Sequence, residues 1–162
     1  MIDDHIGIVG SGILADARYL VDIARVKAQI HKITYGEPVS VHTTAKHLAN
    51  HKHMATQYAG LRPFGIGLLV GGVDSDGPNL YETDPSGTML QWNAQAIGRG
   101  AEKAKKVLSS EFKPNMAVKD GLKLLIKALK AGEKGVTKDN IELSVITEKG
   151  VKKVSATEVD KL

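Results

Sequence analysis

The stretch TQYAGLRPFGIGLLVGGVD, residues 56–74, decides how this chain folds. Gly60 and Pro63 interrupt a helical pattern, and the residues from Phe64 to Val73 are then almost wholly apolar. A run this apolar, with four glycines in it, predicts a strand that is buried on both faces and closely approached by another backbone or helix. We expect this strand to join a helical half of the chain to a sheet.

Two helices are expected before this strand. Residues 13–36 carry apolar side chains at helical spacing on two sides, and Gly36 followed by Pro38 ends the pattern. A second helix is expected from about Thr43 towards Tyr58, with Ser40 among its candidate N-caps. The short connection between the helices predicts an antiparallel helical hairpin that forms one layer.

Short strands separated by turns are expected around this helical pair. An amino-terminal strand, Ile6 to Val9, is predicted to end in a turn at Gly10–Gly12. After the helices, three strands joined by tight turns predict an antiparallel meander. Its parts are, in order, the buried strand, the Asp74–Gly77 turn, the strand Asn79–Thr83, the Asp84–Gly87 turn, and a strand from Thr88 to about Asn93 that extends through Ala94 to Ile97.

The rest of the chain predicts a second helical pair and further strands. This order of elements indicates an α+β fold in which helical layers enclose the strands, although the visible strands make one full sheet and only part of another. The predicted helices lie at 101–111 and about 117–131, and a linker follows at Thr137–Asn140. The predicted strands are Ile141–Thr147 and Val151–Val154. A capping box at Ser155–Glu158 is expected to open a terminal turn that includes Val159 and Leu162.

Length and composition narrow the class of protein. The 162 residues fit a single domain, and 42% hydrophobic with 25% charged residues is ordinary for a globular protein. The amino terminus lacks a signal-peptide pattern, and no apolar run reaches the roughly 20 residues of a membrane span, so we expect a cytosolic protein without a membrane partner. The lack of cysteine excludes disulfides, thiolate nucleophiles and cysteine-ligated metals.

Two features of the sequence suggest a ligand only weakly. Basic residues recur from Arg99 to Lys130, a pattern that can mark a nucleic-acid surface, but a solvated helix face is the simpler interpretation. Histidines cluster as His42, His47, His51 and His53, and His47 and His51 have the spacing that lets two imidazoles share a metal. Neither a third ligand nor the glutamate of an H-E-x-x-H motif accompanies them, so we expect no metal, no cofactor and no nucleic acid.

Two loops resemble ligand-binding motifs and depart from them at required positions. The segment from Asp74 to Gly77 opens like a calcium loop, but Pro85 stands where such a loop needs glutamate. Gly98-Arg99-Gly100 lacks the third glycine of a dinucleotide fingerprint and the lysine of a phosphate loop, which favours close packing of a strand against a helix.

The sequence shows no catalytic nucleophile. Ser11 lies outside any G-x-S-x-G motif and has no evident histidine and acid partners. Met1 and Ile2 do not provide the terminal threonine or serine that an amino-terminal nucleophile requires. From its residues alone, the chain is therefore predicted to be a scaffold or interaction subunit rather than an enzyme.

Four motifs together resemble the alpha subunits of archaeal 20S proteasomes. They are Ala15-Asp16-Ala17-Arg18, Thr34-Tyr35-Gly36, Arg62-Pro63-Phe64-Gly65 and Asp84-Pro85-Ser86-Gly87, and they occur in that family's order and spacing. The resemblance covers Ile2 to Leu162 with few gaps. It implies a four-layer alpha-beta-beta-alpha sandwich of the N-terminal-nucleophile hydrolase type, formed as one domain by residues 1–162. One sheet of this sandwich is expected to be incomplete, because the family's gating tail, first helix and first strands would precede Met1.

The resemblance also implies a function without catalysis. In the family, seven alpha subunits form the outer ring that gates substrate entry for protein degradation, contacts the beta subunits and receives the carboxyl tails of activating ATPase rings. Part of the pocket for these tails corresponds to Gly12, Ile13 and Leu14, whereas the basic residue that pairs with the tail carboxylate would precede Met1. Candidate subunit contacts are Arg18, Tyr35, Tyr58, Arg62 and Phe64. Arg99 and Trp92 are local departures from the family pattern.

Two other functions are kept as alternatives at this point. One is a proteasome-like threonine-type hydrolase with its own active site, which would need an exposed amino-terminal nucleophile. The other is a nucleic-acid-binding protein that uses the basic residues from Arg99 to Lys130.

Overall fold

Residues 1–159 are described by the computed structural model, and they divide into two units. The first unit comprises Met1–Trp92 with Ile146–Gly150, and the second comprises Asn93–Val145 with the residues from Val151. The single domain expected from chain length remains a prediction.

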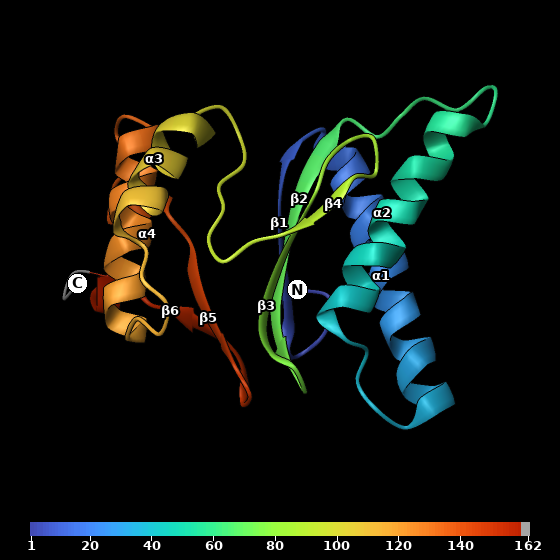
Figure 1. Ribbon diagram of the computed structural model, residues 1–162, viewed down its shortest axis with the longest axis horizontal. Coiled ribbons are helices and arrows are strands. Elements are labelled where there is room, and N and C mark those ends of the chain that lie inside the picture. The colour runs from blue at the N-terminus through green and yellow to red at the C-terminus, as the bar shows by residue number, and fades with distance from the viewer. Residues whose placement is uncertain (160–162) are drawn as a thin grey trace. The chain divides into compact units, whose positions relative to one another are not determined.

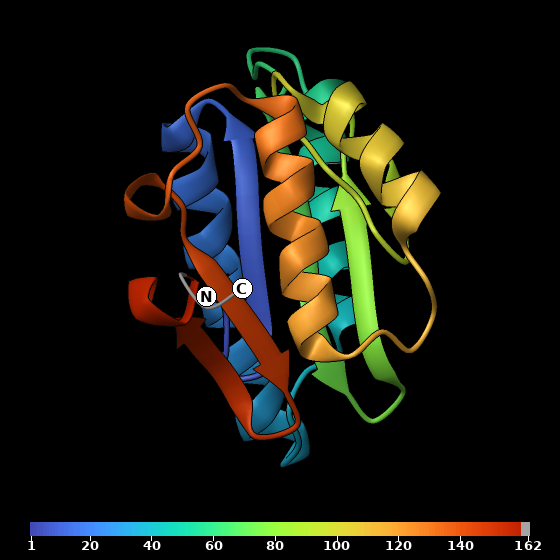
Figure 2. The ribbon, with the colours of Figure 1, turned by 90° about the vertical axis from the view of Figure 1, so that its left-hand side faces the viewer.

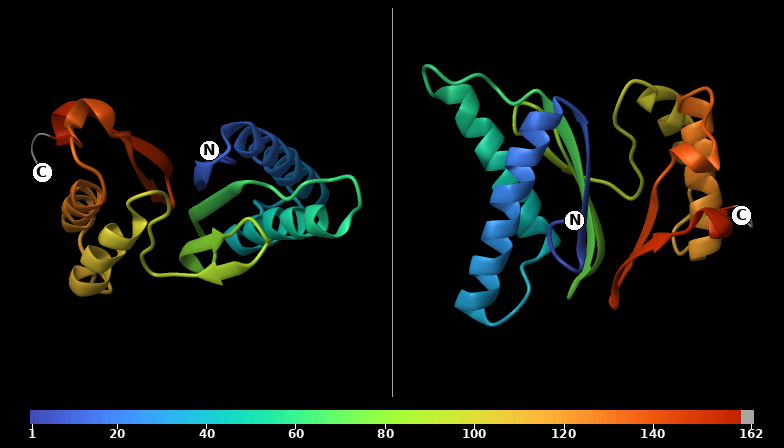
Figure 3. Two further views of the ribbon diagram at one scale, coloured as in Figure 1. Left: turned by 90° about the horizontal axis from the view of Figure 1, so that it is seen from above. Right: turned by 180° about the vertical axis from the view of Figure 1, so that it is seen from behind.

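The first unit is a helical pair on one face of an antiparallel sheet. Figures 1 and 3 show both helices of this unit on the same side of its strands. The strand order β1-β2-β3-β4 confirms the predicted meander. The elements are β1 (Ile6–Gly12), α1 (Leu14–Tyr35), α2 (Val41–Gln57), β2 (Ile66–Asp74), β3 (Gly77–Thr83) and β4 (Met89–Gln91).

Strand β2 lies inside the sheet and is buried on both faces, as predicted. The consecutive residues Leu68, Leu69 and Val70 are all buried, although their side chains alternate between the two faces. The predicted close approach is found at Gly72, where a Cβ atom would lie 2.5 Å from the carbonyl oxygen of His5. Replacement of this glycine would therefore push β1 and β2 apart.

The two helices begin and end close to the predicted positions. Helix α1 buries Leu20, Ala24 and Ala28, and it ends at Gly36, whose left-handed conformation (φ 73°) lets its N–H donate to the carbonyl of Lys32. Helix α2 begins at Val41, two residues earlier than predicted, because Ser40 is its N-cap. The core that these helices share with the sheet includes Ile6, Leu20, Val39, Val41, Ala45, Leu48, Ile66, Leu68 and Val70.

Asp74 connects the β2–β3 hairpin turn to the start of α2. Its Oδ1 accepts hydrogen bonds from the backbone N–H of Asp76 at 3.1 Å and from the side-chain amide of Asn79 at 3.2 Å. Its Oδ2 accepts the N–H of Val41 at 2.8 Å, at the helix terminus where negative charge is favourable. The hairpin turn predicted from the Asp74–Gly77 sequence is confirmed.

Strands β1 and β4 of this unit differ most from the prediction. Strand β1 continues through Gly10–Gly12, where a turn was expected, because these residues pair with Leu68, Gly67 and Ile66 of β2. Strand β4 comprises Met89–Gln91 alone, so the expected extension through Ala94 to Ile97 is wrong. The N–H of Trp92 still donates to the carbonyl of Leu80, and the chain then leaves the sheet.

The second unit contains a pair of packed helices, α3 (Ala101–Glu111) and α4 (Val118–Gly132), seen together in Figure 2. Ala104 and Leu108 of α3 pack with Leu124 and Ala128 of α4. The prediction of strand-to-helix packing at Gly98–Gly100 is wrong, because Gly100 lies against Gly132 at the end of α4. A Cβ atom on Gly100 would lie 2.2 Å from the carbonyl oxygen of Gly132.

After α4 the chain forms short elements. The predicted linker contains a 3-10 turn, η1 (Lys138–Asn140), which is followed by β5 (Leu143–Thr147) and β6 (Gly150–Val154). These strands make a two-stranded sheet whose tip belongs to the first unit. The last described element is α5 (Ala156–Val159), and Leu162, predicted to lie in the same turn, is outside the described residues.

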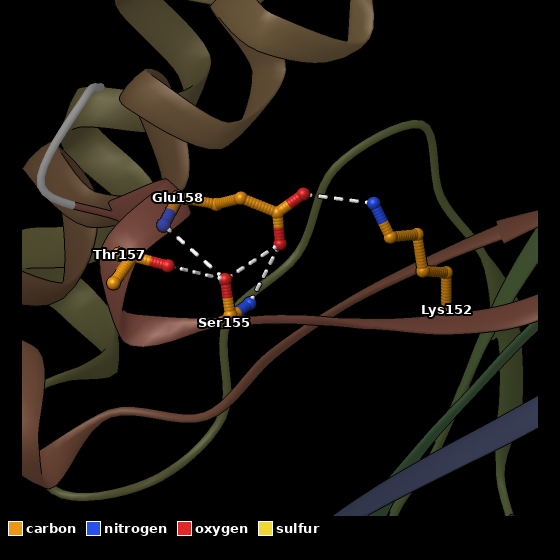
Figure 4. A network of polar contacts seen from close by, with 4 residues as sticks. All are labelled: Lys152, Ser155, Thr157 and Glu158. Atoms are coloured by element: carbon orange, nitrogen blue, oxygen red, sulfur yellow. Dashed lines mark hydrogen bonds and ion pairs between the residues drawn. The ribbon is translucent and has the colours of Figure 1, made fainter.

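The predicted capping box at the start of α5 is confirmed and is drawn in Figure 4. The backbone N–H of Ser155 donates to Glu158 Oε2 at 2.9 Å, and the N–H of Glu158 donates to Ser155 Oγ at 3.3 Å. Lys152 adds an ion pair to Glu158 at 2.8 Å. Hydrogen bonds from Lys152 and Ser155 lower the pKa of Glu158 to about 2.

Candidate functional site

The Gly12–Leu14 turn connects β1 to α1 and presents apolar side chains to solvent. Leu14 is 72% exposed, and Ile13 is 46% exposed. Gly12 has a positive φ of 134°, and a Cβ atom there would lie 2.2 Å from the carbonyl oxygen of Gly65. The N–H of Ile13 donates to that same oxygen at 2.8 Å. The turn is thus fixed against the segment that precedes β2.

A bidentate ion pair between Asp16 and Arg62 holds this segment to α1. Arg62 Nη2 donates to Asp16 Oδ1 at 2.7 Å, and Arg62 Nη1 donates to Asp16 Oδ2 at 2.8 Å. The N–H of Gly65 also donates to Asp16 Oδ2, at 2.8 Å. The buried carboxylate of Asp16 therefore accepts three hydrogen bonds, which is the arrangement that makes burial of a charge tolerable.

These contacts change the acidity of both partners. Hydrogen bonds from Arg62, and then from Gly65, lower the pKa of Asp16 to about 2. The hydrogen bond to Asp16 and its negative charge raise the pKa of Arg62 above its usual value. Both groups are therefore charged throughout the physiological range.

A buried lysine lies between α2 and the sheet. Lys52 is 0% exposed, and its Nζ donates to the carbonyl of Ile66 at 2.9 Å. It also donates to the carbonyl of Thr83 at 3.0 Å and to the hydroxyl of Thr83 at 2.8 Å. Lys52 thereby joins the beginning of β2 to the end of β3.

The Asp84–Thr88 turn follows Thr83 directly and packs on α2. Asp84 Oδ1 accepts the backbone N–H groups of Ser86 and Thr88 and the hydroxyl of Ser86. Burial alone would raise the pKa of Asp84, but the hydrogen bonds from Ser86 and Thr88 outweigh it and lower the pKa. Gly87 lies so close to α2 that a Cβ atom would be 2.5 Å from the carbonyl oxygen of Ala49.

The predicted contact residues are spread over the helical layer of the first unit. Arg62 and Phe64 lie beside the first turns of α1, where the rings of Phe64 and Tyr19 stack with centroids 6.0 Å apart. Tyr35 is the last residue of α1 and Tyr58 follows α2, and both are exposed. Arg18 is exposed on α1. The structure therefore separates Tyr35 from Arg62 by the length of α1.

Helix α1 carries a second row of apolar side chains, which are mostly exposed. Its members follow one another at intervals of four and three residues, the spacing of a helix seam that packs against another helix. We call them the α1 row: Tyr19, Ile23, Val26, Ile30 and Ile33. Ile33 is the most exposed of them, at 85%.

The histidines do not form a metal site among residues 1–159. The rings of His47 and His51 lie 5.9 Å apart, but no group of three histidine, aspartate or glutamate side chains in this part of the chain is placed to hold a metal ion. Burial, followed by the charges of His51 and Lys27, lowers the pKa of His47. No described helix combines the length and the apolar character that a membrane span requires.

Two residues of this site were not assigned a role from the sequence. Asp16 was noted only as part of the Ala15–Arg18 motif, although its carboxylate holds Arg62 and Gly65. Lys52 had a detectable signal, because it continues the apolar face formed by Ala45, Leu48 and Ala55 of α2. A lysine on the buried face of a helix needs polar partners, and the strand ends supply them.

Comparison with known proteins identifies the family. The sequence profile of the family described as "Proteasome subunit" matches residues 1–146. The chain is 45% identical over 162 residues to a proteasome subunit alpha of Pyrococcus horikoshii and 46% identical to that of Pyrococcus abyssi, in each case over 99% of this chain and 62% of the relative. It is 41% identical over 163 residues to the proteasome subunit alpha of Methanococcus maripaludis, over 99% of this chain and 63% of the relative.

The chain thus spans somewhat less than two thirds of the length of the curated relatives that it matches. The matched region includes the Gly12–Leu14 turn, the Asp16–Arg62 ion pair and the α1 row. We conclude that the chain belongs to the proteasome subunit family, and that the relatives named above, which align with 99% of its residues, are alpha subunits.

Proposed function

We propose that this chain acts as a non-catalytic alpha-type subunit of a 20S proteasome core particle. In this role it contributes to the outer heptameric ring that gates the entry of substrates for degradation in the cytoplasm. The observation that carries the proposal is the identity of 41–46% to archaeal proteasome subunits alpha over 99% of the chain.

The fold proposed for the assembled subunit is the four-layer sandwich of the N-terminal-nucleophile hydrolases. The helical pair α1–α2 on the sheet β1–β4 supplies two of these layers, and α3–α4 supplies a third. The fourth layer is a second sheet to which β5 and β6 contribute. Support comes from the family match over residues 1–146.

The proposed partners are other alpha subunits, beta subunits and an activating ATPase ring. The α1 row supports the first two, because exposed apolar side chains at this spacing are suited to pack against a helix of a neighbouring subunit. The Gly12–Leu14 turn supports the third, since its exposed Ile13 and Leu14 offer apolar contacts to a peptide tail. Arg18, Tyr35, Tyr58, Arg62 and Phe64 are proposed as further subunit contacts.

Native mass spectrometry tests the proposal. We expect the chain, alone or mixed with an archaeal beta subunit, to form seven-membered rings or mixed ring assemblies. Only monomers at every concentration and mixture would contradict assembly by this chain. An active-site probe for threonine-type hydrolases should leave the chain unlabelled, because covalent labelling would show a nucleophile and contradict the non-catalytic role.

A further inference from the structure

Lys52 connects two strand ends through a full set of hydrogen bonds. Its ammonium has three N–H bonds, and the carbonyls of Ile66 and Thr83 together with the Thr83 hydroxyl provide three acceptors at 2.8–3.0 Å. A lysine that loses all contact with water is stable only when its donors are satisfied in this way. The lysine therefore constrains the backbone at both carbonyls.

The backbone that Lys52 holds is the one on which the Gly12–Leu14 turn rests. Ile66 is the pairing partner of Gly12 in the β1–β2 register. Gly65, the preceding residue, accepts the N–H of Ile13 and donates its own N–H to Asp16. A shift of the Ile66 peptide would thus move the strand residue that pairs with Gly12. It would also move the Gly65 carbonyl that accepts the N–H of Ile13.

We propose that Lys52 is a positioning residue for the Gly12–Leu14 turn, because it ties the backbone of Ile66, against which this turn packs, to Thr83. The role of the turn in docking a peptide tail rests on the proposed function. The positioning itself is a property of the folded chain and can be measured without any partner.

Deprotonation changes how Lys52 holds the two strand ends, because an ammonium donates stronger hydrogen bonds than a neutral amine and the bond to the Thr83 hydroxyl reverses its direction. An ammonium donates to all three oxygens, whereas a neutral amine donates to the two carbonyls and accepts a hydrogen bond from the hydroxyl. Burial lowers the pKa of Lys52 from 10.5 to about 8, and the negative charge of Asp84 opposes that shift. The groups that face Lys52 from β2 and β3 are the uncharged ones of Ile66 and Thr83, and Asp84 lies in the turn after β3.

The direct test is an NMR titration of the isotope-labelled chain between pH 6 and pH 10. We expect the Cε and Hε signals of Lys52 to titrate near pH 8, well below an ordinary lysine. The amide signals of Gly67, whose nitrogen is bonded to the Ile66 carbonyl, and those of Gly12 and Ile13 should shift with the same midpoint. Amides of Gly12 and Ile13 that do not respond while Lys52 titrates would overturn the proposal.

Variants separate positioning from general stability. Lys52→Met keeps most of the side-chain volume and should abolish the titration at Gly12 and Ile13, whereas Lys46→Met, at an exposed position of the same helix, should leave it unchanged. Should Lys52→Met fail to fold, Thr83→Val serves instead. It should move the Lys52 midpoint further down, because the ammonium loses an acceptor, and Thr83→Ser should restore the midpoint. Identical midpoints in all Thr83 variants would count against the proposal.

A separate measurement distinguishes this proposal from the proposed function. A synthetic peptide with a free carboxyl end, taken from an activating ATPase, can be titrated into the same labelled sample. Failure of the peptide to bind while the Lys52-linked titration persists would count against docking and leave positioning intact. Binding of the peptide without that titration would count against positioning alone.

Discussion

The carboxylate of Asp16 in the first turn of α1 receives both Nη atoms of Arg62, which lies 46 residues later in the chain, at 2.7 and 2.8 Å. The side chain of Arg62 is 60% exposed, whereas the side chain of Asp16 is only 9% exposed. The pair is therefore anchored from the buried side, by a carboxylate that also holds the N–H of Gly65. Loss of Asp16 should release both Arg62 and Gly65, and so loosen the segment to which the N–H of Ile13 in the Gly12–Leu14 turn is bound.

Asp16→Asn should weaken the fold in a pH-dependent way. The folded chain lowers the pKa of Asp16 from 3.8 to about 2, so the ionised carboxylate stabilises the fold fully above pH 3.8 and progressively less as the pH falls towards 2. Urea unfolding of both proteins should therefore show a constant difference near neutral pH that shrinks between about pH 4 and pH 2. Asp22→Asn, at an exposed position paired with Arg25, is the matched control. A difference that does not change with pH would contradict this role of Asp16.

Gly12→Ala should destabilise the chain more than Gly36→Ala. Both glycines have positive φ, for which a residue with a side chain costs about 1–2 kcal/mol. At Gly36 the new Cβ would meet nothing within 4 Å, whereas at Gly12 it would lie 2.2 Å from the Gly65 oxygen and force the turn away from β2. Thermal unfolding of the two variants measures the difference. Equal losses of stability would show that Gly12 does not pack against Gly65 as described.

Leu48→Ala should cost about 2–5 kcal/mol of unfolding free energy, because Leu48 is fully buried between α2 and the sheet. Met54→Ala, at a position of the same helix that is half exposed, should change the free energy by about 0.5 kcal/mol or less. Denaturant unfolding of the two variants checks the prediction. A small effect at Leu48 would place the core of the first unit elsewhere.

Ile33→Gln should weaken ring assembly without weakening the folded chain. Ile33 is 85% exposed in the α1 row, so its replacement should leave the unfolding free energy within about 0.5 kcal/mol. In an assembly it would lose apolar contact with the neighbouring subunit, and native mass spectrometry should show fewer rings. Lys32→Gln, at the adjacent exposed position, is the control. Unchanged ring formation by Ile33→Gln would exclude this end of the α1 row from the interface.

The elements of the fold were predictable wherever local chemistry decides them. The ends of α1, the Asp74–Gly77 hairpin and the capping box of Ser155 and Glu158 each follow from a few residues close in sequence, and each is confirmed. The prediction was wrong where pairing with a segment distant in sequence determines the secondary structure. Gly10–Gly12 has the composition of a turn, yet it is strand because Ile66, Gly67 and Leu68 pair with it.

The candidate site was predictable in part. The Gly12–Leu14 turn and Arg62 were named through the family resemblance, but the partner of Arg62 was not, because Asp16 is one of several acidic residues and only the folded chain brings the two together. Lys52 was missed because an isolated lysine in a helical pattern ordinarily faces water. Its place on the apolar face of α2 was the available signal.

The carboxylate of Asp74 has a consequence for how the first unit folds. It closes the β2–β3 hairpin through Asp76 and Asn79, which are near in sequence, and it caps α2 at Val41, which is far away. Hairpins form within microseconds from local contacts, so the turn can be in place before the long-range contact is made. A preformed hairpin presents a ready acceptor to the first N–H of the helix, so a turn later in the chain can help to fix the start of an earlier helix.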